Sequence, residues 1–505
     1  MNKNSRTYNA ALNLSISVVQ KITAILLTFV GRQVFLQVLS VEYLGINRLF
    51  GDVLNILSLA DLGLATAMAY SFYKPLAEKD EDKLAALIGL YRKIYNIIAA
   101  VVAVAGISLV PFLHHIINLE NEIAHIEVYY IIALSTTVLS YLFVYKATII
   151  TADQNSRIAA KYAVWVSSAR TSAQIIILLT TGSFMLFSAV TIFSTIAYNL
   201  LISRKADKLY PFIKRRVKLA AADKRDVFVN MRSIAVYKLS YVVYKGTDNI
   251  FISVLVGTAA VGYYANYQLA VTNLAAVCFL AFNTLAPSIG NLIAQETPEK
   301  RLQVFKLMQA ASCWLSGFFI FCLFFLLDDF VALWLGEEFV FDFFIKAAML
   351  LSFYTSVALY PVVAFRNAAG MYQKTKHVML TAAMLKIIFS VLGGIYLGLP
   401  GIILATVASR LATYAWYEPR ILFREFLGGR AAGFLYGHAV NFLLLAACIA
   451  LAYLLPRQEV AGWGGWLLKG AAYTLMINAV YLLRYFKTPE FRVISGKLRY
   501  LLRRK

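Results

Sequence analysis

Charged residues are scarce in this chain. Asp, Glu, Lys and Arg make up 15% of its 505 residues, whereas apolar residues make up 60%. Soluble globular proteins carry about 25% charged residues, so this composition excludes an ordinary soluble protein. The few charges are also unbalanced, with 48 Lys and Arg against 26 Asp and Glu. Both the apolar excess and the cationic excess need an explanation.

Cysteine and histidine are rare as well, with four and five copies. The cysteines lie inside apolar segments without metal-binding spacing, a pattern typical of thiols packed in a core. They are Cys278, Cys313, Cys322 and Cys448. His114, His115 and His125 flank one loop, but the sequence has no HExxH-type motif. We therefore predict no metal site.

Catalytic motifs are missing from the sequence. It contains no GxSxG, no Walker motif, no DxD pair in a soluble domain and no nucleotide-binding pattern. We therefore predict that the chain is not an enzyme, does not hydrolyse ATP and needs no cofactor. Any transport against a gradient would then be driven by an ion gradient, the membrane potential or consumption of the transported product.

Apolar stretches of roughly 20 residues recur along the chain, and stretches of that length span a bilayer as helices. We predict an all-α polytopic membrane protein with about fourteen transmembrane helices. The first apolar run is too long for a signal-peptide core and lacks a cleavage pattern, so it counts as a span. The spans are 10–37, 46–72, 85–113, 126–150, 158–181, 185–203, 233–256, 262–294, 303–327, 341–365, 376–398, 401–424, 432–455 and 463–486.

The order of the spans predicts two parallel six-helix lobes plus two C-terminal helices, a MATE-like arrangement. Residues 1–203 form the N-terminal lobe and 204–232 a basic linker. Residues 233–427 form the C-terminal lobe, and 428–505 hold the last two spans and a basic tail. Both lobes begin outward from the same side, so the repeat is related by an axis along the membrane normal.

Loop charges orient this topology. Cations concentrate in one set of alternate loops, in the 204–232 linker and in the tail from Arg484 to Lys505. The positive-inside rule therefore places the linker and both termini in the cytoplasm. At that face the cations meet anionic lipid head groups, so membrane lipids rather than nucleic acid are the expected partner of the basic charge.

Charged side chains also occur inside the spans. Lys238, Lys245 and Asp248 share one face of the seventh span, and Lys21 lies near the middle of the first. The offset between Lys21 and Lys238 is 217, and the same offset separates two turn glycines, at positions 45 and 262. A shared offset favours two copies of one structural unit.

Cations inside the spans outnumber carboxylates. The site cations are Lys21, Arg32, Arg48, Arg170, Lys238 and Lys245, with Lys386 and Arg410 deeper in the second half. The carboxylates are Asp52, Asp61 and Asp248, as coupling or pairing groups. Arg48 precedes Asp52 by four residues, so the two can pair on one helix face. Each cation could serve packing only, but as a set they predict a wet, electropositive cavity that suits an anionic head group.

A neutral polar line follows the eighth span. Asn266, Tyr267 and Asn273 are candidate sugar contacts, because amide, hydroxyl and aromatic groups recognise sugars. Tyr near a membrane interface is more often an anchor, and both interpretations stay open.

Two stretches carry a resemblance to a known family. They are LSVEYLGINRLFGDVLNILSLADLGLATAMAYSFYKPLAEKD and KGTDNIFISVLVGTAAVGYYANYQL, the second followed by PSIGNLIA. With the fourteen spans and the basic middle loop, they resemble the Wzx-type oligosaccharide flippases. These belong to the polysaccharide biosynthesis family, within the multidrug/oligosaccharidyl-lipid/polysaccharide (MOP) exporter superfamily.

The resemblance implies two lobes around a cavity that opens alternately to either side of the bacterial cytoplasmic membrane. It implies a substrate of undecaprenyl diphosphate carrying an oligosaccharide, destined for O-antigen, capsule or exopolysaccharide. It also implies that Lys21, Arg48, Lys238 and Lys245 hold the diphosphate. The family often has Glu where Asp61 stands, so the carboxylate is kept.

The expected function is thus export of a lipid-linked oligosaccharide, with a polysaccharide polymerase and glycosyltransferases as further partners. A proton- or sodium-coupled multidrug extruder is the main alternative, and the excess of deep cations argues against it. A flippase for the peptidoglycan lipid precursor is a second alternative, poorly separated by sequence. A membrane-embedded glycan polymerase or ligase would need a larger outer loop than the chain provides.

Overall fold

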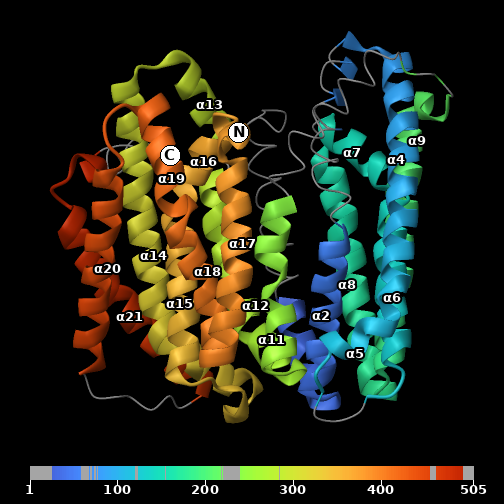
Figure 1. The fold of residues 1–505 in the computed structure, drawn as a ribbon, viewed down its shortest axis with the longest axis horizontal. Coiled ribbons are helices and arrows are strands. Elements are labelled where there is room, and N and C mark those ends of the chain that lie inside the picture. Colours follow the sequence, from blue (N-terminus) through green and yellow to red (C-terminus); the bar gives the residue numbers. More distant parts are fainter. Residues whose placement is uncertain are drawn as a thin grey trace. The chain divides into compact units, whose positions relative to one another are not determined.

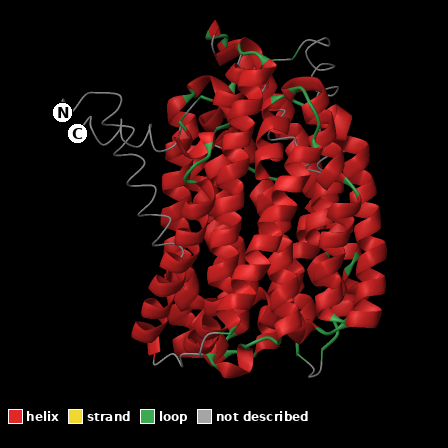
Figure 2. Ribbon diagram, turned by 90° about the vertical axis from the view of Figure 1, so that its left-hand side faces the viewer, coloured by secondary structure: helices red, strands yellow, loops and turns green. Residues whose placement is uncertain are grey.

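The computed structural model describes residues 26–58, 68, 71–72, 75–76, 78–119, 123–153, 155–215, 217, 219, 239–283, 285–454 and 462–492. Within these ranges every regular element is a helix (Figure 2). The chain packs as two compact units, Met1–Gly262 and Tyr263–Lys505, here called the first and second units. This division concerns packing, and the lobe boundaries at 203, 232 and 427 stay predictions.

The first unit holds the helices up to the start of α12 (Figure 1). They are Leu26–Val38, α2 (Val41–Leu57), α4 (Glu81–Ser108), η2 (Val110–Phe112), α5 (Leu113–Ile116), α6 (Ile126–Tyr141), α7 (Val144–Ala152), α8 (Ser156–Thr181), α9 (Phe184–Leu209), η3 (Pro211–Lys214), 239–246 and α11 (Asp248–Leu255). Helix α12 (Thr258–Asn283) begins in this unit and continues into the second.

The second unit holds the remaining helices, with α14, α15, α17 and α18 running side by side (Figure 1). They are α13 (Ala286–Gln295), α14 (Pro298–Leu335), η4 (Glu337–Phe339), α15 (Phe343–Ala358), α16 (Tyr360–Ala368), α17 (Tyr372–Leu397), α18 (Leu399–Ala412), α19 (Tyr414–Leu422), η5 (Phe423–Leu427), α20 (Ala432–Tyr453) and α21 (Gly462–Tyr485).

Nine helices in the described ranges are long and apolar enough to cross a membrane. A tenth span results if α6 and α7, bent by 45° at a short break, are counted as one. The all-α, many-span architecture predicted from composition is therefore confirmed. The count of fourteen is consistent with these helices, because parts of the first and seventh predicted spans lie outside the described residues.

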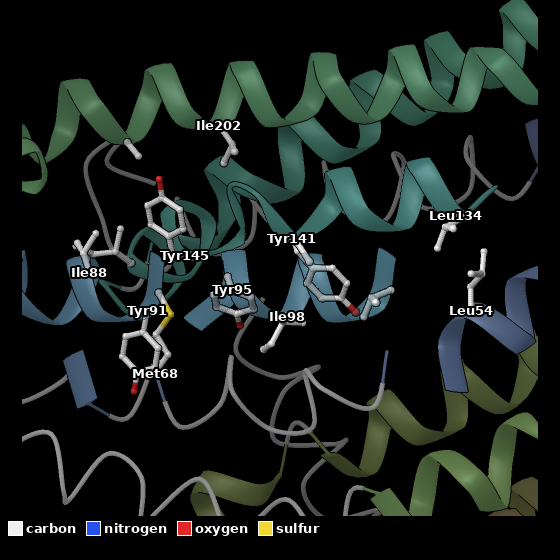
Figure 3. Close-up of a cluster of buried hydrophobic side chains, with 14 of the residues drawn as sticks. Leu54, Met68, Ile88, Tyr91, Tyr95, Ile98, Leu134, Tyr141, Tyr145 and Ile202 are labelled. Atoms are coloured by element: carbon white, nitrogen blue, oxygen red, sulfur yellow. The ribbon is translucent and has the colours of Figure 1, made fainter. Parts of the chain in front are cut away.

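Aromatic side chains fill the core of the first unit. Tyr91 and Tyr95 of α4 are fully buried, and Tyr95 stacks on Tyr141 of α6 with ring centroids 6.4 Å apart (Figure 3). The hydroxyl of Tyr91 shares a 3.0 Å hydrogen bond with Ser71. Asp80 directly precedes helix α4, and its side chain accepts the Lys83 backbone N–H and so caps the helix.

The second unit has its own aromatic core. Phe305 of α14 is fully buried and packs edge-on against the rings of Phe365 and Phe423, at centroid distances of 5.4 and 5.2 Å. Phe434 of α20 approaches the same ring at 5.6 Å. Helices α14, α16 and α20 and the η5 turn are therefore joined by one apolar cluster, which supports the polar contacts described below.

Candidate functional site

Two glycines allow α2 and the start of α12 to cross at backbone contact. A Cβ on Gly45 would lie 2.1 Å from the Thr258 carbonyl oxygen, and one on Gly262 would lie 2.2 Å from the Val41 carbonyl oxygen. The 217-residue offset noted in the sequence relates Val41 to Thr258 and Gly45 to Gly262, since 258 − 41 and 262 − 45 both equal 217, so each glycine contacts the equivalent of the other's partner. The contacts are thus reciprocal, as two related copies meeting about a two-fold axis would make them.

The turn between α11 and α12 is also fixed to the end of α5. The Ser253 hydroxyl donates to the Ile116 carbonyl at 2.8 Å. The Thr258 N–H donates to the Asn118 carbonyl at 2.7 Å, and the Asn118 N–H donates to the Thr258 hydroxyl at 3.0 Å. Ser253 and Thr258 are fully buried. Sequence reasoning missed these two residues, because small hydroxyl side chains in apolar helices carry no distinctive pattern.

A cluster of polar side chains lies where α11 packs on α2. Arg48 Nε lies 3.4 Å from Asp52 Oδ2, which confirms the pair expected from their four-residue spacing. The Asn249 amide, buried on α11, donates to the same Asp52 oxygen. Asp52 therefore has an ion-pair partner and a hydrogen-bond donor, while the Arg48 side chain stays 49% exposed. Its remaining N–H groups can reach a ligand.

Arg32 belongs to the same neighbourhood. It lies on the helix Leu26–Val38, near enough to Arg48 for the two positive charges to act on each other. Two positive charges that repel each other raise the energy of the site when it holds no anion, and they favour the binding of one. On the seventh span, Lys245 is exposed and Asp248 is half buried at the start of α11. The first unit thus gathers Arg32, Arg48, Asp52 and the two seventh-span charges on neighbouring or consecutive helices.

Arg170 lies on α8 and is half buried. Its Nε is enclosed by protein and has no hydrogen-bond partner in the described part of the chain. A guanidinium has five N–H donors and no acceptor, so a buried unpaired N–H is costly. An anion or water would relieve that cost.

Three predicted site residues, Lys21, Asp61 and Lys238, lie outside the described residues. Their roles stay predictions. No cluster of three or more His, Cys, Asp or Glu able to hold a metal occurs in the ranges that the structure describes.

The candidate sugar contacts lie on α12 in the second unit. The Tyr267 hydroxyl donates to Asp328 Oδ1 at 3.0 Å and accepts the Phe341 N–H at the same distance. The Asn273 amide donates to its own helix, to the Leu269 carbonyl at 2.7 Å. Asn266 is fully buried. Tyr267 therefore joins helices, and sugar contact by these side chains stays a prediction.

No protein-family model matches the sequence, and no curated protein matches it significantly. The fold is nevertheless shared with solved structures of MOP-superfamily transporters, and the chain is a multi-pass membrane protein. A lipid II flippase, MurJ, in an inward closed conformation has 12% identity and a TM-score of 0.65, over 94% of this chain and 100% of that one.

Two further structures have the same fold. A multidrug resistance MATE family transporter, inward-facing, has 13% identity and a TM-score of 0.57, over 87% of this chain and 98% of that one. A MOP superfamily transporter from Pyrococcus furiosus, described as having a binding pocket of reverse polarity, has 14% identity and a TM-score of 0.55, over 86% and 95%. At these identities the similarity establishes the architecture.

Proposed function

We propose that this chain is a flippase. It would move undecaprenyl-diphosphate-linked oligosaccharides across the bacterial cytoplasmic membrane for surface polysaccharide synthesis, by alternating access. The observation that carries the proposal is the cation group of the first unit, above all the half-exposed Arg48 beside Arg32. Arginine forks match phosphate oxygens in charge and geometry, so a diphosphate is the chemistry that these side chains suit best.

The state of Asp52 argues against a cation as cargo. A site for a cationic drug needs an available carboxylate, yet Asp52 already forms an ion pair with Arg48 and accepts a hydrogen bond from Asn249. An anion, by contrast, would add acceptors where N–H donors are in excess. Arg170 also favours an anionic cargo, because its enclosed Nε has no acceptor among the described residues.

The fold supports transport in general. The similar structures are named as a lipid II flippase and as multidrug transporters, so the architecture serves more than one class of cargo. The peptidoglycan lipid precursor is a second candidate cargo, favoured by the TM-score of 0.65 along the whole chain to a lipid II flippase. Both candidates are undecaprenyl diphosphates, so the argument from the arginines applies to either.

The test is mass spectrometry of lipid-linked glycans in a deletion strain, its parent and complemented strains. We expect the deletion to accumulate an undecaprenyl diphosphate oligosaccharide and to lose a surface polymer. R48Q with R170Q should fail to complement at normal protein level, whereas R424Q, an exposed arginine outside the site, should complement.

Other outcomes identify the alternatives. Accumulation of the peptidoglycan precursor instead would assign the second cargo. An unchanged lipid pool with new sensitivity to cationic drugs would overturn the proposal in favour of a multidrug extruder.

A further inference from the structure

The last turn of α21 is held against α14 by a stack of aromatic rings. The Trp314 ring lies parallel to those of Tyr481 and Tyr485, with centroids 6.1 Å away in each case. Gly317, one turn along α14, leaves room for the Tyr481 hydroxyl, which a Cβ there would meet at 1.7 Å. That hydroxyl donates to Asn441 of α20 at 2.9 Å. The end of α21 is therefore a fixed surface.

Arg484 projects from this surface and is half buried. One of its Nη atoms donates to Asn441 Oδ1 at 3.2 Å, and its Cζ lies 5.4 Å from the centroid of the Tyr485 ring. Both contacts are with neutral groups. Glu490 is near enough for its charge to act on Tyr485, yet no carboxylate within the described ranges forms an ion pair with Arg484.

These contacts leave most of the N–H groups of the Arg484 guanidinium available to a further acceptor. It has five N–H donors, and the Asn441 amide oxygen takes one while also accepting from Tyr481. The C-terminal helix dipole favours a cation here but provides only a fraction of a charge. A half-buried cation with neutral partners at the end of a membrane-length helix leaves donors that a phosphate can fill.

The neighbouring side chains indicate where that phosphate comes from. Leu482 and Leu483, just before Arg484, are 46% and 79% exposed, and Phe486 just after it is 56% exposed. Apolar side chains exposed beside a cation suit acyl chains beneath a head group rather than a soluble ion. The positive-inside orientation predicts that this end of α21 lies at the cytoplasmic leaflet, where anionic lipids concentrate.

We propose that Arg484, oriented by Asn441 and the Trp314–Tyr481–Tyr485 stack, binds the phosphate of an anionic phospholipid of the cytoplasmic leaflet. This site is separate from the cation group of the first unit. Bound lipid would stabilise the attachment of α20 and α21 to α14, because the lipid binds the native packing and not the unfolded chain.

The experiment uses the full chain in nanodiscs of phosphatidylcholine, with or without phosphatidylglycerol, and measures thermal unfolding. Phosphatidylglycerol should raise the unfolding midpoint of the unaltered protein and of R424Q, an exposed arginine that already pairs with Glu425. The rise should disappear in R484Q. An equal rise in R484Q would overturn the proposal.

Two further arms complete the test. Inorganic phosphate added to pure phosphatidylcholine nanodiscs should give no rise; an Arg484-dependent rise would assign the site to a soluble anion and overturn the lipid source. Native mass spectrometry counts the lipids that each protein retains. This measurement uses R484K and therefore does not depend on R484Q folding correctly. The unaltered protein should retain at least one more phosphatidylglycerol than R484K, which keeps the charge but loses the fork; equal retention would contradict the proposal.

Discussion

Arg366 of the second unit and Arg48 of the first are each paired with a carboxylate, but the two pairs differ in burial. Arg366 Nη1 lies 2.8 Å from Glu418 Oε1, with side chains 9% and 2% exposed. Arg48 Nε lies 3.4 Å from Asp52 Oδ2, with side chains 49% and 15% exposed. In the first pair both charged groups are buried against each other. In the second pair much of the Arg48 guanidinium is exposed and can bind a ligand.

Other charges extend this contrast. In the second unit Lys346 pairs with Asp328, and Lys469 pairs with Asp329 at 2.6 Å. Among its described residues, the first unit has one comparable buried ion pair, Lys146 with Asp207 at 2.7 Å. The same residues include Arg170, whose enclosed Nε has no hydrogen-bond partner among them. A charge inside a span therefore indicates function only after its partner is known.

The largest expected effect follows from the buried pair. E418Q would leave the Arg366 charge buried without its carboxylate, which costs about 3–5 kcal/mol. We expect strongly reduced protein level and a lowered unfolding midpoint of the purified protein.

The double variant R366M/E418M is the matched control. It removes both charges and fills the space with apolar atoms, so it should recover most of the lost stability. If E418Q were as stable as the unaltered protein, the proposed difference between the buried structural pair of Arg366 and Glu418 and the half-exposed Arg48 would be wrong.

The next effect concerns the available charges. Removing a charge-assisted contact to phosphate costs about 1.5–3 kcal/mol, equivalent to about 10–100-fold in affinity. We expect R48Q and R170Q each to weaken binding of an undecaprenyl diphosphate lipid by that factor, measured on protein in nanodiscs. Their unfolding midpoints should stay close to that of the unaltered protein. Unfolding as severe as that of E418Q, with binding intact, would show that these arginines are structural.

Local patterns in the sequence were enough to predict the helical class and the contact between Arg48 and Asp52. Apolar runs set the spans, and a four-residue spacing places two side chains on one helix face. The 217-residue offset also anticipated that Gly45 and Gly262 hold equivalent positions, which the reciprocal contacts agree with.

Long-range partners could not be predicted in this way. Asn249 reaches Asp52 across 197 residues, and Tyr267 is engaged by Asp328 and Phe341. The sequence showed Arg410 only as one of the cations that outnumber the carboxylates inside the spans. In the structure it donates to neutral oxygens, including the Ser352 carbonyl at 2.9 Å. Such contacts depend on how helices pack, and no spacing rule in a single sequence encodes that packing.

A smaller effect should come from Gly317 in the second unit. G317A would place a Cβ 1.7 Å from the Tyr481 hydroxyl, so the ring must move and its bond to Asn441 is lost. Overpacking of this kind costs about 1–3 kcal/mol. In a Y481F background the ring must still move, because its Cζ and Cε2 would lie 2.2 and 2.6 Å from the new Cβ. The same substitution should nevertheless cost less there, because no hydrogen bond to Asn441 is lost when the ring moves. Thermal unfolding of the four proteins of this double-mutant cycle gives the coupling, and strict additivity would contradict the contact.

The smallest expected effect is an ion pair at the surface, the opposite extreme from Arg366 and Glu418. The Lys374 ammonium, hydrogen-bonded to Glu425, lowers the pKa of that carboxyl below its ordinary value of 4.5, and Arg424 adds to the effect. A carboxyl with a lowered pKa contributes stability above its unfolded-state pKa and loses it as pH falls through the folded-state pKa.

The pair is largely exposed, with the Lys374 side chain 54% and that of Glu425 23% accessible. We therefore expect it to contribute under about 1 kcal/mol to the free energy of unfolding. The unfolding midpoint of E425Q should fall slightly below that of the unaltered protein at pH 7. The difference should shrink as pH falls through the lowered folded-state pKa of Glu425, and it should vanish in stronger acid, where this carboxyl is protonated in both states. A difference that persisted or grew in acid would show that Glu425 acts through packing rather than charge.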